Sequence, residues 1–311
     1  MATHCFPWIF QAGLHHGAGQ LPTPIRRSPG PLPEVLDSGE ELGASIWVNI
    51  HGKTVVDLWG GYANLGRTQA WEQDTITNVF STSKTIFGLV GLMLVERGLV
   101  DLHEPVSTYW PEFAANGKEA VKFCHIISHT SGVAGWEDRM TMEDVFDLEK
   151  SPAKLAAQKP WWTPGTASGY HSLTMGHLVG EVVRRTTGKS LTQFIQDEIA
   201  GPLHADFQLG VCEADLYRVS DIIPFVRPPG DAPLLNPQSV SFKVRTNPAI
   251  GFGVANNAGW RKAEIGAANG HSNAAAIGRI LSTITCGGAL MGCGSYQPIR
   301  LKKYFRSSHK E

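Results

Sequence analysis

The sequence predicts an α+β fold in which a small antiparallel sheet packs with a mostly helical domain. Two β-rich segments within residues 43–60 flank a short turn, which is the pattern of a β-hairpin. From residue 78 to residue 286 the spacing of apolar residues is mostly helical. With 311 residues, 42% of them hydrophobic, the chain is long enough to bury a large core.

The hairpin follows a segment that has little regular pattern. Residues 1–39 carry closely spaced prolines, so we expect an irregular N-terminal arm there. The hairpin strands are predicted at 44–50 and 54–59, joined by the turn His51-Gly52-Lys53. Because two strands alone are only marginally stable, this hairpin needs partners from elsewhere in the chain.

The helical region divides at recognisable start and stop residues. Ser172 and Ser190 are suitable N-caps, and Gly98 and Gly188 are suitable helix ends. We predict helices at 81–97, 124–128, 173–187, 191–199 and 273–286.

Two stretches do not follow this helical pattern. Residues 211–258 are rich in Pro and Asn, which predicts a long surface excursion. Residues 291–311 form an atypical tail that is polar and basic and shows no packing pattern.

Composition excludes several classes of partner. A net charge of -1 argues against nucleic acid or an anionic membrane surface as the main partner. No run of 18 apolar residues occurs, so no membrane span is predicted. The five scattered cysteines indicate reduced thiols, and no signal peptide is visible. We therefore expect a cytoplasmic protein.

The most informative motif is Ser81-Thr82-Ser83-Lys84, at the start of a strongly apolar helix. Residues three apart share a helix face, so the amine of Lys84 can reach the hydroxyl of Ser81. Burial and the positive end of the helix dipole both favour the neutral amine, which makes the serine an activated nucleophile. The alternative is that Ser81 is only a helix cap.

Other motifs give weaker signals. The Ser-x-x-Lys spacing recurs at Ser151 and Ser307, but neither precedes an apolar helix. The triplet 188–190 lacks the first glycine of a phosphate loop. His125 and His129 have the i, i+4 spacing of a metal pair, but no third ligand lies nearby, so packing and capping roles are favoured. We predict no metal and no cofactor.

With these residues considered, the chain resembles the serine β-lactamase and penicillin-binding-protein superfamily. The closer resemblance is to its class C-like branch, which includes family VIII carboxylesterases and fungal lovastatin-acyltransferase-like proteins. Residues 81–84 resemble the nucleophile motif, 127–132 resemble the family's "L-S-H-T-S-G" segment, and 164–172 resemble the segment with the catalytic tyrosine. Further similar segments lie in the family's order at 56–63, 98–106, 260–264 and 269–274.

The resemblance implies a β-lactamase/transpeptidase-like fold over residues 40–290. It implies that Ser81 attacks a carbonyl to form an acyl-enzyme and that Lys84 keeps the serine reactive. Tyr170 would relay the proton between the serine and the leaving group. Ser172 stands where many relatives have Asn, and we expect it to cap the following helix, to contact the substrate, or both. Which of Lys84 and Tyr170 is the formal base is left open.

The sequence departs from the family at its C-terminal end. The third family motif, Lys/His-x-Gly on a strand, is not found after the helix at 273–286. That strand supplies an oxyanion donor in relatives, and losing one such donor costs about 10²–10³ in rate. We therefore expect a reduced sheet, weak turnover and self-association through uncovered apolar faces.

Three functions fit these observations. The first is a serine hydrolase acting on a small-molecule ester, thioester or amide, most simply a carboxylesterase. The second is an acyltransferase of secondary metabolism that moves an acyl group, from an acyl-carrier donor for example, to an alcohol of a natural product. The third is a pseudo-enzyme that keeps a binding pocket without turnover.

Overall fold

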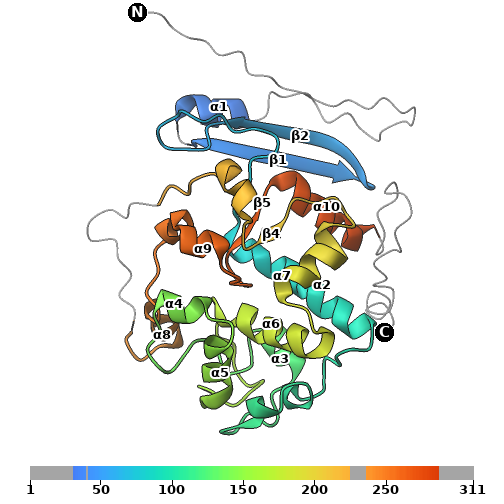
Figure 1. Ribbon diagram of the computed structural model, residues 1–311, viewed down its shortest axis with the longest axis vertical. Helices are drawn as coiled ribbons and strands as arrows, with labels where there is room; N and C mark the ends of the chain where they lie inside the picture. The colour runs from blue at the N-terminus through green and yellow to red at the C-terminus, as the bar shows by residue number, and fades with distance from the viewer. Residues whose placement is uncertain (1–30, 40, 225–235, 287–311) are drawn as a thin grey trace, which may run out of the picture.

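The computed structural model describes residues 31–39, 41–224 and 236–286. Figure 1 shows a β-hairpin at one end of the molecule and a helical body below it. Short strands and the last helix lie between these two parts. The first helix, α1 (Pro31–Ser38), lies beside the hairpin.

Helix α1 corrects the prediction of an irregular arm over residues 1–39. The structure places a helix at Pro31–Ser38, whereas residues 1–30 lie outside the described part. Pro31 and Pro33 stand in the first turn of α1, where a backbone N–H has no partner within the helix. Proline at these positions therefore suits a helix start and does not break the helix that follows.

The predicted hairpin is present as β1 (Gly43–Ile50) and β2 (Lys53–Gly61), paired antiparallel. Its missing partner is helix α10 (Ala274–Thr285), which packs against β1. The ring of Trp47 fills the space beside Gly278, where any Cβ would overlap it. The hairpin is thus anchored by the last described helix.

Within the described residues, no element packs over the other face of β1. Ile46, Val48 and Ile50 alternate along the strand, and each is exposed by more than a third. Exposed apolar rows of this kind favour association between chains. The self-association expected from the sequence stays a prediction.

A second sheet was not predicted from the sequence. Strands β3 (Thr77–Asn78), β4 (Gln208–Leu209) and β5 (Gly270–Ser272) form it in the order β3-β5-β4, with both pairings antiparallel. Strands of two or three residues are too short to show an alternating pattern. They draw together three distant parts of the chain.

The predicted helices are present, with ends shifted by at most four residues. The helix predicted at 191–199 ends as an α-helix at residue 195 and continues as a π-helical turn over Gln196–Ala200. One unpredicted helix lies within the stretch 211–258. Besides α1 and α10, the helices are α2 (Ser83–Glu96), α3 (Phe123–Ile127), α4 (Met142–Phe146), α5 (Lys150–Ala157), α6 (Thr174–Thr187), α7 (Leu191–Ile195), α8 (Val240–Thr246) and α9 (Ala258–Lys262).

The predicted helix caps have different outcomes. Ser190 caps α7 by accepting a hydrogen bond from the backbone N–H of Gln193 at 3.1 Å, and Gly188 ends α6 with a φ of 74°. The prediction that Ser172 caps α6 is wrong, because the cap position falls on Leu173 and carries no side-chain hydrogen bond. Ser172 lies one residue too early.

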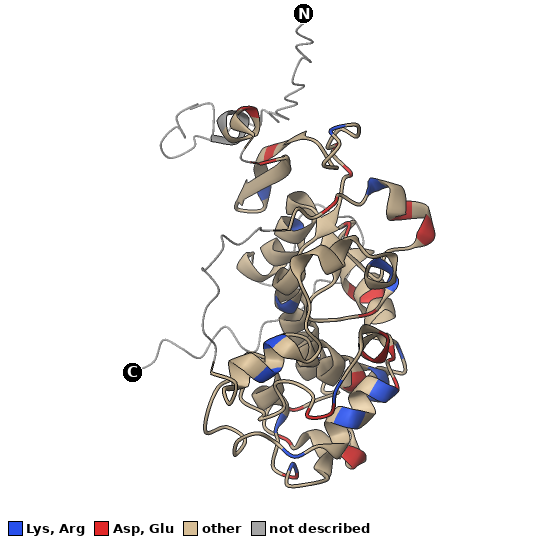
Figure 2. Ribbon diagram, turned by 90° about the vertical axis from the view of Figure 1, so that its left-hand side faces the viewer, with Lys and Arg blue, Asp and Glu red and all other residues tan. Residues whose placement is uncertain are grey.

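Helix α2 runs through the centre of the core. Ile86, Phe87, Val90 and Leu94 are fully buried along it. Basic and acidic residues are interspersed over the rest of the described chain (Figure 2). Within the described residues, no helix has the length and apolarity needed to cross a membrane.

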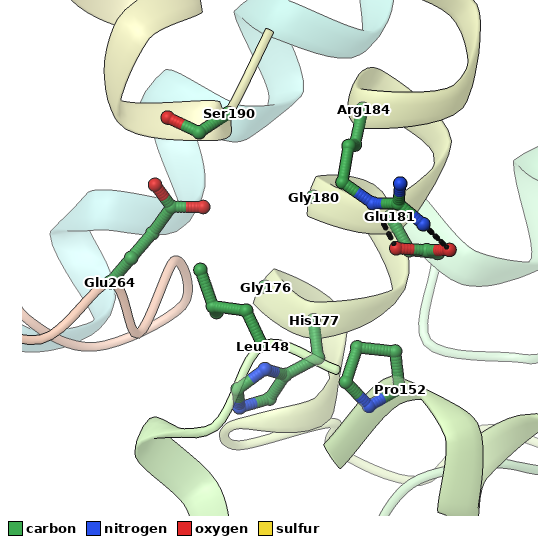
Figure 3. Close-up of a pocket in the computed structure, with 9 residues that line it drawn as sticks. All are labelled: Leu148, Pro152, Gly176, His177, Gly180, Glu181, Arg184, Ser190 and Glu264. Atoms are coloured by element: carbon green, nitrogen blue, oxygen red, sulfur yellow. Dashed lines mark hydrogen bonds and ion pairs between the residues drawn. The ribbon is translucent and has the colours of Figure 1, made fainter. Parts of the chain in front are cut away.

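The imidazole of His177, on helix α6, is also buried in the core. The ring is 3% exposed and borders a cavity of about 40 Å³, and neither of its nitrogens has a hydrogen-bond partner among the residues that the structure describes. Figure 3 shows it near Leu148 and Pro152, while Glu181 on the same helix pairs with Arg184. Burial lowers the pKa of His177 to about 4.

His177 should make the fold sensitive to acid. Its pKa in the folded state lies below its unfolded value of about 6.5, so the unfolded chain binds the proton first. Stability is therefore lost as the pH falls from about 6.5 toward 4. We predict that His177→Leu reduces this loss by up to about 2 kcal/mol at pH 5, measured by thermal melting at pH 7.5 and pH 5. The exposed His103→Leu is the control, and an unchanged pH dependence in His177→Leu would contradict the prediction.

Candidate active site

The short central sheet fixes the start of helix α2. Val79, which follows β3, donates its N–H to the carbonyl of Gly270 on β5 at 2.8 Å. A 3₁₀ turn at Phe80–Thr82 then leads into α2. Phe80 has a φ of 42°, a conformation that costs a non-glycine residue roughly 1–3 kcal/mol. This turn presents Ser81 at the protein surface.

Two buried polar side chains hold this turn in place. Ser83 accepts the N–H of Gly270 at 3.0 Å and is fully buried. Asn78 accepts the indole N–H of Trp260 at 2.6 Å and donates to the carbonyl of Ala268 at 2.9 Å. Each buried hydrogen bond joins the nucleophile segment to residues near 260–270. Removing one partner would leave a buried polar group unsatisfied, at a cost of about 1–3 kcal/mol.

Lys84 lies one turn after Ser81, with its Nζ 3.1 Å from the Ser81 Oγ. The same Nζ donates to the carbonyl of Ser172 at 2.8 Å and to the carbonyl of Ala267 at 2.9 Å. Burial lowers the pKa of Lys84 to about 8. The amine is therefore surrounded by three oxygens and is more readily neutral than an exposed lysine.

Tyr170 completes the cluster from a loop far away in sequence. Its hydroxyl donates to the Ser81 Oγ at 2.6 Å, and the Lys84 Nζ lies 4.7 Å from its ring centroid. The tyrosine is half exposed, so its hydroxyl can exchange a proton with a bound substrate. The structure thus brings Ser81, Lys84 and Tyr170 together as the sequence predicted.

Two proton arrangements fit these distances. A neutral Lys84 can give its two N–H groups to the carbonyls of Ser172 and Ala267, which leaves its lone pair for the Ser81 hydroxyl proton. A charged Lys84 donates to all three oxygens, and the Ser81 hydroxyl can then point its proton toward the Tyr170 oxygen. Either arrangement moves the serine proton away from the oxygen that would attack.

Ser172 contributes to the site through its backbone. Its carbonyl accepts from Lys84, and its N–H bonds the carbonyl of Tyr170 at 3.0 Å. The predicted contact of its side chain with substrate remains a prediction. The residues of the atypical tail, 291–311, lie outside the described part of the chain.

Sequence reasoning missed the carbonyl of Ala267. This acceptor lies in the loop before β5, which Asn269 braces by accepting the N–H of Ile265 at 2.9 Å and donating to the carbonyl of Trp260 at 2.8 Å. Residues 260–264 and 269–274 resemble the family in sequence, but that resemblance assigned no role to the loop between them. A backbone carbonyl has no residue type, so only the three-dimensional arrangement reveals it.

The histidine pair considered for a metal has other partners. His125 accepts the backbone N–H of Lys122 through Nδ1 at 3.2 Å. His129 accepts the backbone N–H of His171 through Nδ1, also at 3.2 Å. The Nδ1 atom of each histidine thus accepts a hydrogen bond from the main chain, which agrees with packing and capping roles.

Comparisons with known proteins identify relatives of this chain. A family model described as Beta-lactamase matches residues 32–298. The esterase/beta-lactamase LipL of Mycobacterium tuberculosis (strain ATCC 25618 / H37Rv) is 31% identical over 275 residues, which cover 80% of this chain and 60% of LipL. Esterase EstB of Burkholderia gladioli is 32% identical over 179 residues, covering 52% of this chain and 45% of EstB.

Solved structures agree with the sequence relatives. A family VIII carboxylesterase superposes with a TM-score of 0.78 at 38% identity, covering 84% of this chain and 69% of the other. EstA from Arthrobacter nitroguajacolicus Rue61a superposes with a TM-score of 0.73 at 30% identity, covering 87% and 71%.

These findings confirm the resemblance and the β-lactamase/transpeptidase-like fold that the sequence indicated. The chain spans 60% of the length of LipL and 45% of that of EstB. With its family model covering residues 32–298, the chain belongs to the Beta-lactamase family.

Proposed function

We propose that the chain is a serine hydrolase that cleaves small-molecule carboxylic esters through an acyl-enzyme. The observation that carries this proposal is the Ser81 Oγ, which lies 3.1 Å from the Lys84 Nζ and 2.6 Å from the Tyr170 hydroxyl. A serine hydroxyl becomes a useful nucleophile when a base can accept its proton. The names of esterase/beta-lactamase LipL, esterase EstB and the family VIII carboxylesterase support an ester as the substrate.

The chemistry divides into two halves. In the first, the Ser81 Oγ attacks the ester carbonyl carbon while its proton passes to the Lys84–Tyr170 pair. The tetrahedral intermediate collapses, the alcohol leaves with that proton, and the acyl group remains on Ser81. In the second, water attacks the acyl-enzyme and gives a proton to the same pair, which returns it to the Ser81 Oγ as the carboxylic acid leaves.

Tyr170 is well placed to transfer the proton to the leaving alcohol. Its hydroxyl touches the Ser81 Oγ and its side chain is 50% exposed, whereas Lys84 is largely buried and tied to two carbonyls. Tyr170 is therefore the member of the pair that can give the proton directly to the leaving oxygen.

Covalent labelling tests the nucleophile. A fluorophosphonate probe should add once to the wild-type protein, and intact-mass spectrometry should show no adduct on Ser81→Ala. Ser151→Ala is the matched control because Ser151 has the same spacing to a lysine, on helix α5. It should label like the wild type. An adduct that persists in Ser81→Ala would place the nucleophile elsewhere, and a folded but unreactive wild type would contradict the hydrolase proposal.

The pH profile tests the role of Lys84. Because its pKa is lowered to about 8, the neutral amine fraction rises as the pH increases through 8. At pH 7 only about a tenth of the amine is neutral. If the neutral amine is the base, acylation by a p-nitrophenyl ester should rise about tenfold from pH 7 to a plateau above pH 9, after subtraction of spontaneous hydrolysis.

Substitution then separates the two candidate bases. Lys84→Arg keeps the charge but stays protonated, so it should remove the rise and lower the rate at least ~100-fold. A rise that survives in Lys84→Arg would assign the base role to Tyr170 instead. Lys118→Met is the control, because Lys118 also has a pKa of about 8 but bonds the carbonyls of Ala115 and Gln158.

A further inference from the structure

The loop that carries Tyr170 lies outside any helix or strand. Residues 167–171 have no regular secondary structure, and Tyr170 is half exposed. Its hydroxyl nevertheless lies 2.6 Å from the Ser81 Oγ. An exposed side chain on a loop has many accessible conformations, so something must hold the loop in this one.

His129 contacts this loop on both sides of Tyr170. The carbonyl of His129 accepts the N–H of Gly169 at 3.0 Å, and its Nδ1 accepts the N–H of His171 at 3.2 Å. Its ring also packs on the Tyr170 ring, with centroids 5.0 Å apart. One residue thus fixes the backbone before and after Tyr170 and covers one side of its ring.

The conformation of His129 is specialised for these contacts. Its φ of 63° places it in the left-handed region, which histidine adopts uncommonly. Nδ1 accepts a backbone N–H, so the ring carries its proton on Nε2. Burial and the nearby Lys84 lower the pKa of His129, so this acceptor is present at neutral pH.

A buried relay braces the far end of the same loop. His171 donates from Nδ1 to the carbonyl of Gly169, because a carbonyl can only accept, and its Nε2 accepts the hydroxyl of Ser131 at 2.6 Å. Ser131 in turn accepts the N–H of Val133 at 3.1 Å. His129 and Ser131 therefore attach the 127–132 segment to the loop at neighbouring points.

We propose that His129 is a positioning residue for the reaction, holding Tyr170 in register with Ser81 through its Nδ1 acceptor and its ring. The inference rests on the hydrolase function proposed above. Within the described part of the chain, the side-chain contacts of His129 are with Tyr170 and His171, so it acts through Tyr170. Its removal should therefore lower kcat and leave KM nearly unchanged.

Two substitutions separate the acceptor from the rest of the side chain. His129→Ala removes the acceptor and the ring, and it should lower kcat for a p-nitrophenyl ester about 10- to 100-fold with KM changed less than twofold. His129→Asn keeps an acceptor oxygen at the δ1 position and tolerates the left-handed conformation, so it should recover activity to within about fivefold of the wild type. Equal losses in the two variants would overturn the proposal.

His51 supplies a matched control for backbone strain. It is a histidine with a φ of 53° in the turn of the hairpin. His51→Ala imposes the same kind of conformational strain and should leave kcat unchanged. If His129→Ala does not fold, His129→Gly replaces it, because glycine adopts the left-handed region without strain.

A double-mutant cycle tests whether His129 acts through Tyr170. Once Tyr170→Phe has removed the hydroxyl, adding His129→Ala should slow fluorophosphonate labelling less than twofold further. Losses that multiply in the double variant would show that His129 acts independently of Tyr170 and would overturn the inference.

Crystal structures of the two His129 variants decide the question without any turnover. We expect the Tyr170 hydroxyl to leave hydrogen-bond distance of Ser81 in His129→Ala and to stay within it in His129→Asn. A Tyr170 that is unmoved in His129→Ala would refute the positioning role. An unreactive wild type with this expected displacement would instead refute the hydrolase proposal alone.

Discussion

The buried amine of Lys84 is the constraint on which the site depends. Removing an amine from water is costly unless its N–H groups find acceptors inside the protein. Lys84 finds two of them in carbonyls, those of Ser172 and Ala267, which lie 88 and 183 residues away in the sequence. Satisfying one side chain therefore brings the loop after Tyr170 and the loop before β5 onto the first turn of α2. The geometry around Ser81 follows from that requirement.

The short sheet performs the complementary task of holding the serine. Strands of two or three residues contribute little stability by themselves. Here they join β3, which precedes the nucleophile, to β5, and buried hydrogen bonds from Asn78 and Ser83 reinforce the connection. The strained backbone conformation of Phe80 is held in place by this strand pairing and by these hydrogen bonds. Helix α2 is packed in the core along its length, and it fixes the position of Lys84 relative to Ser81.

Features that depend on neighbouring residues could be predicted from the sequence, whereas contacts between distant segments could not. The Ser81–Lys84 pair follows from helical spacing, and the hairpin follows from strand alternation around a turn, so both were accessible. The resemblance supplied Tyr170, because no spacing rule links it to Ser81 across 89 residues. The carbonyl of Ala267 was not accessible, since every residue has one. Ser172 was placed at the correct site for the wrong reason: its backbone serves Lys84, and its side chain does not cap α6.

The charges in the site are coupled in a way that protects its geometry. Lys84 is one of the causes that lower the pKa of His129, because two nearby cations repel each other. When Lys84 is protonated, protonation of His129 is disfavoured further, and the Nδ1 acceptor toward His171 is preserved. When Lys84 is neutral at higher pH, His129 is also neutral, because the lowered pKa of His129 lies below that pH. The acceptor that fixes the Tyr170 loop is therefore present in both protonation states of the lysine, so the proton can leave and return during a catalytic cycle without releasing the tyrosine.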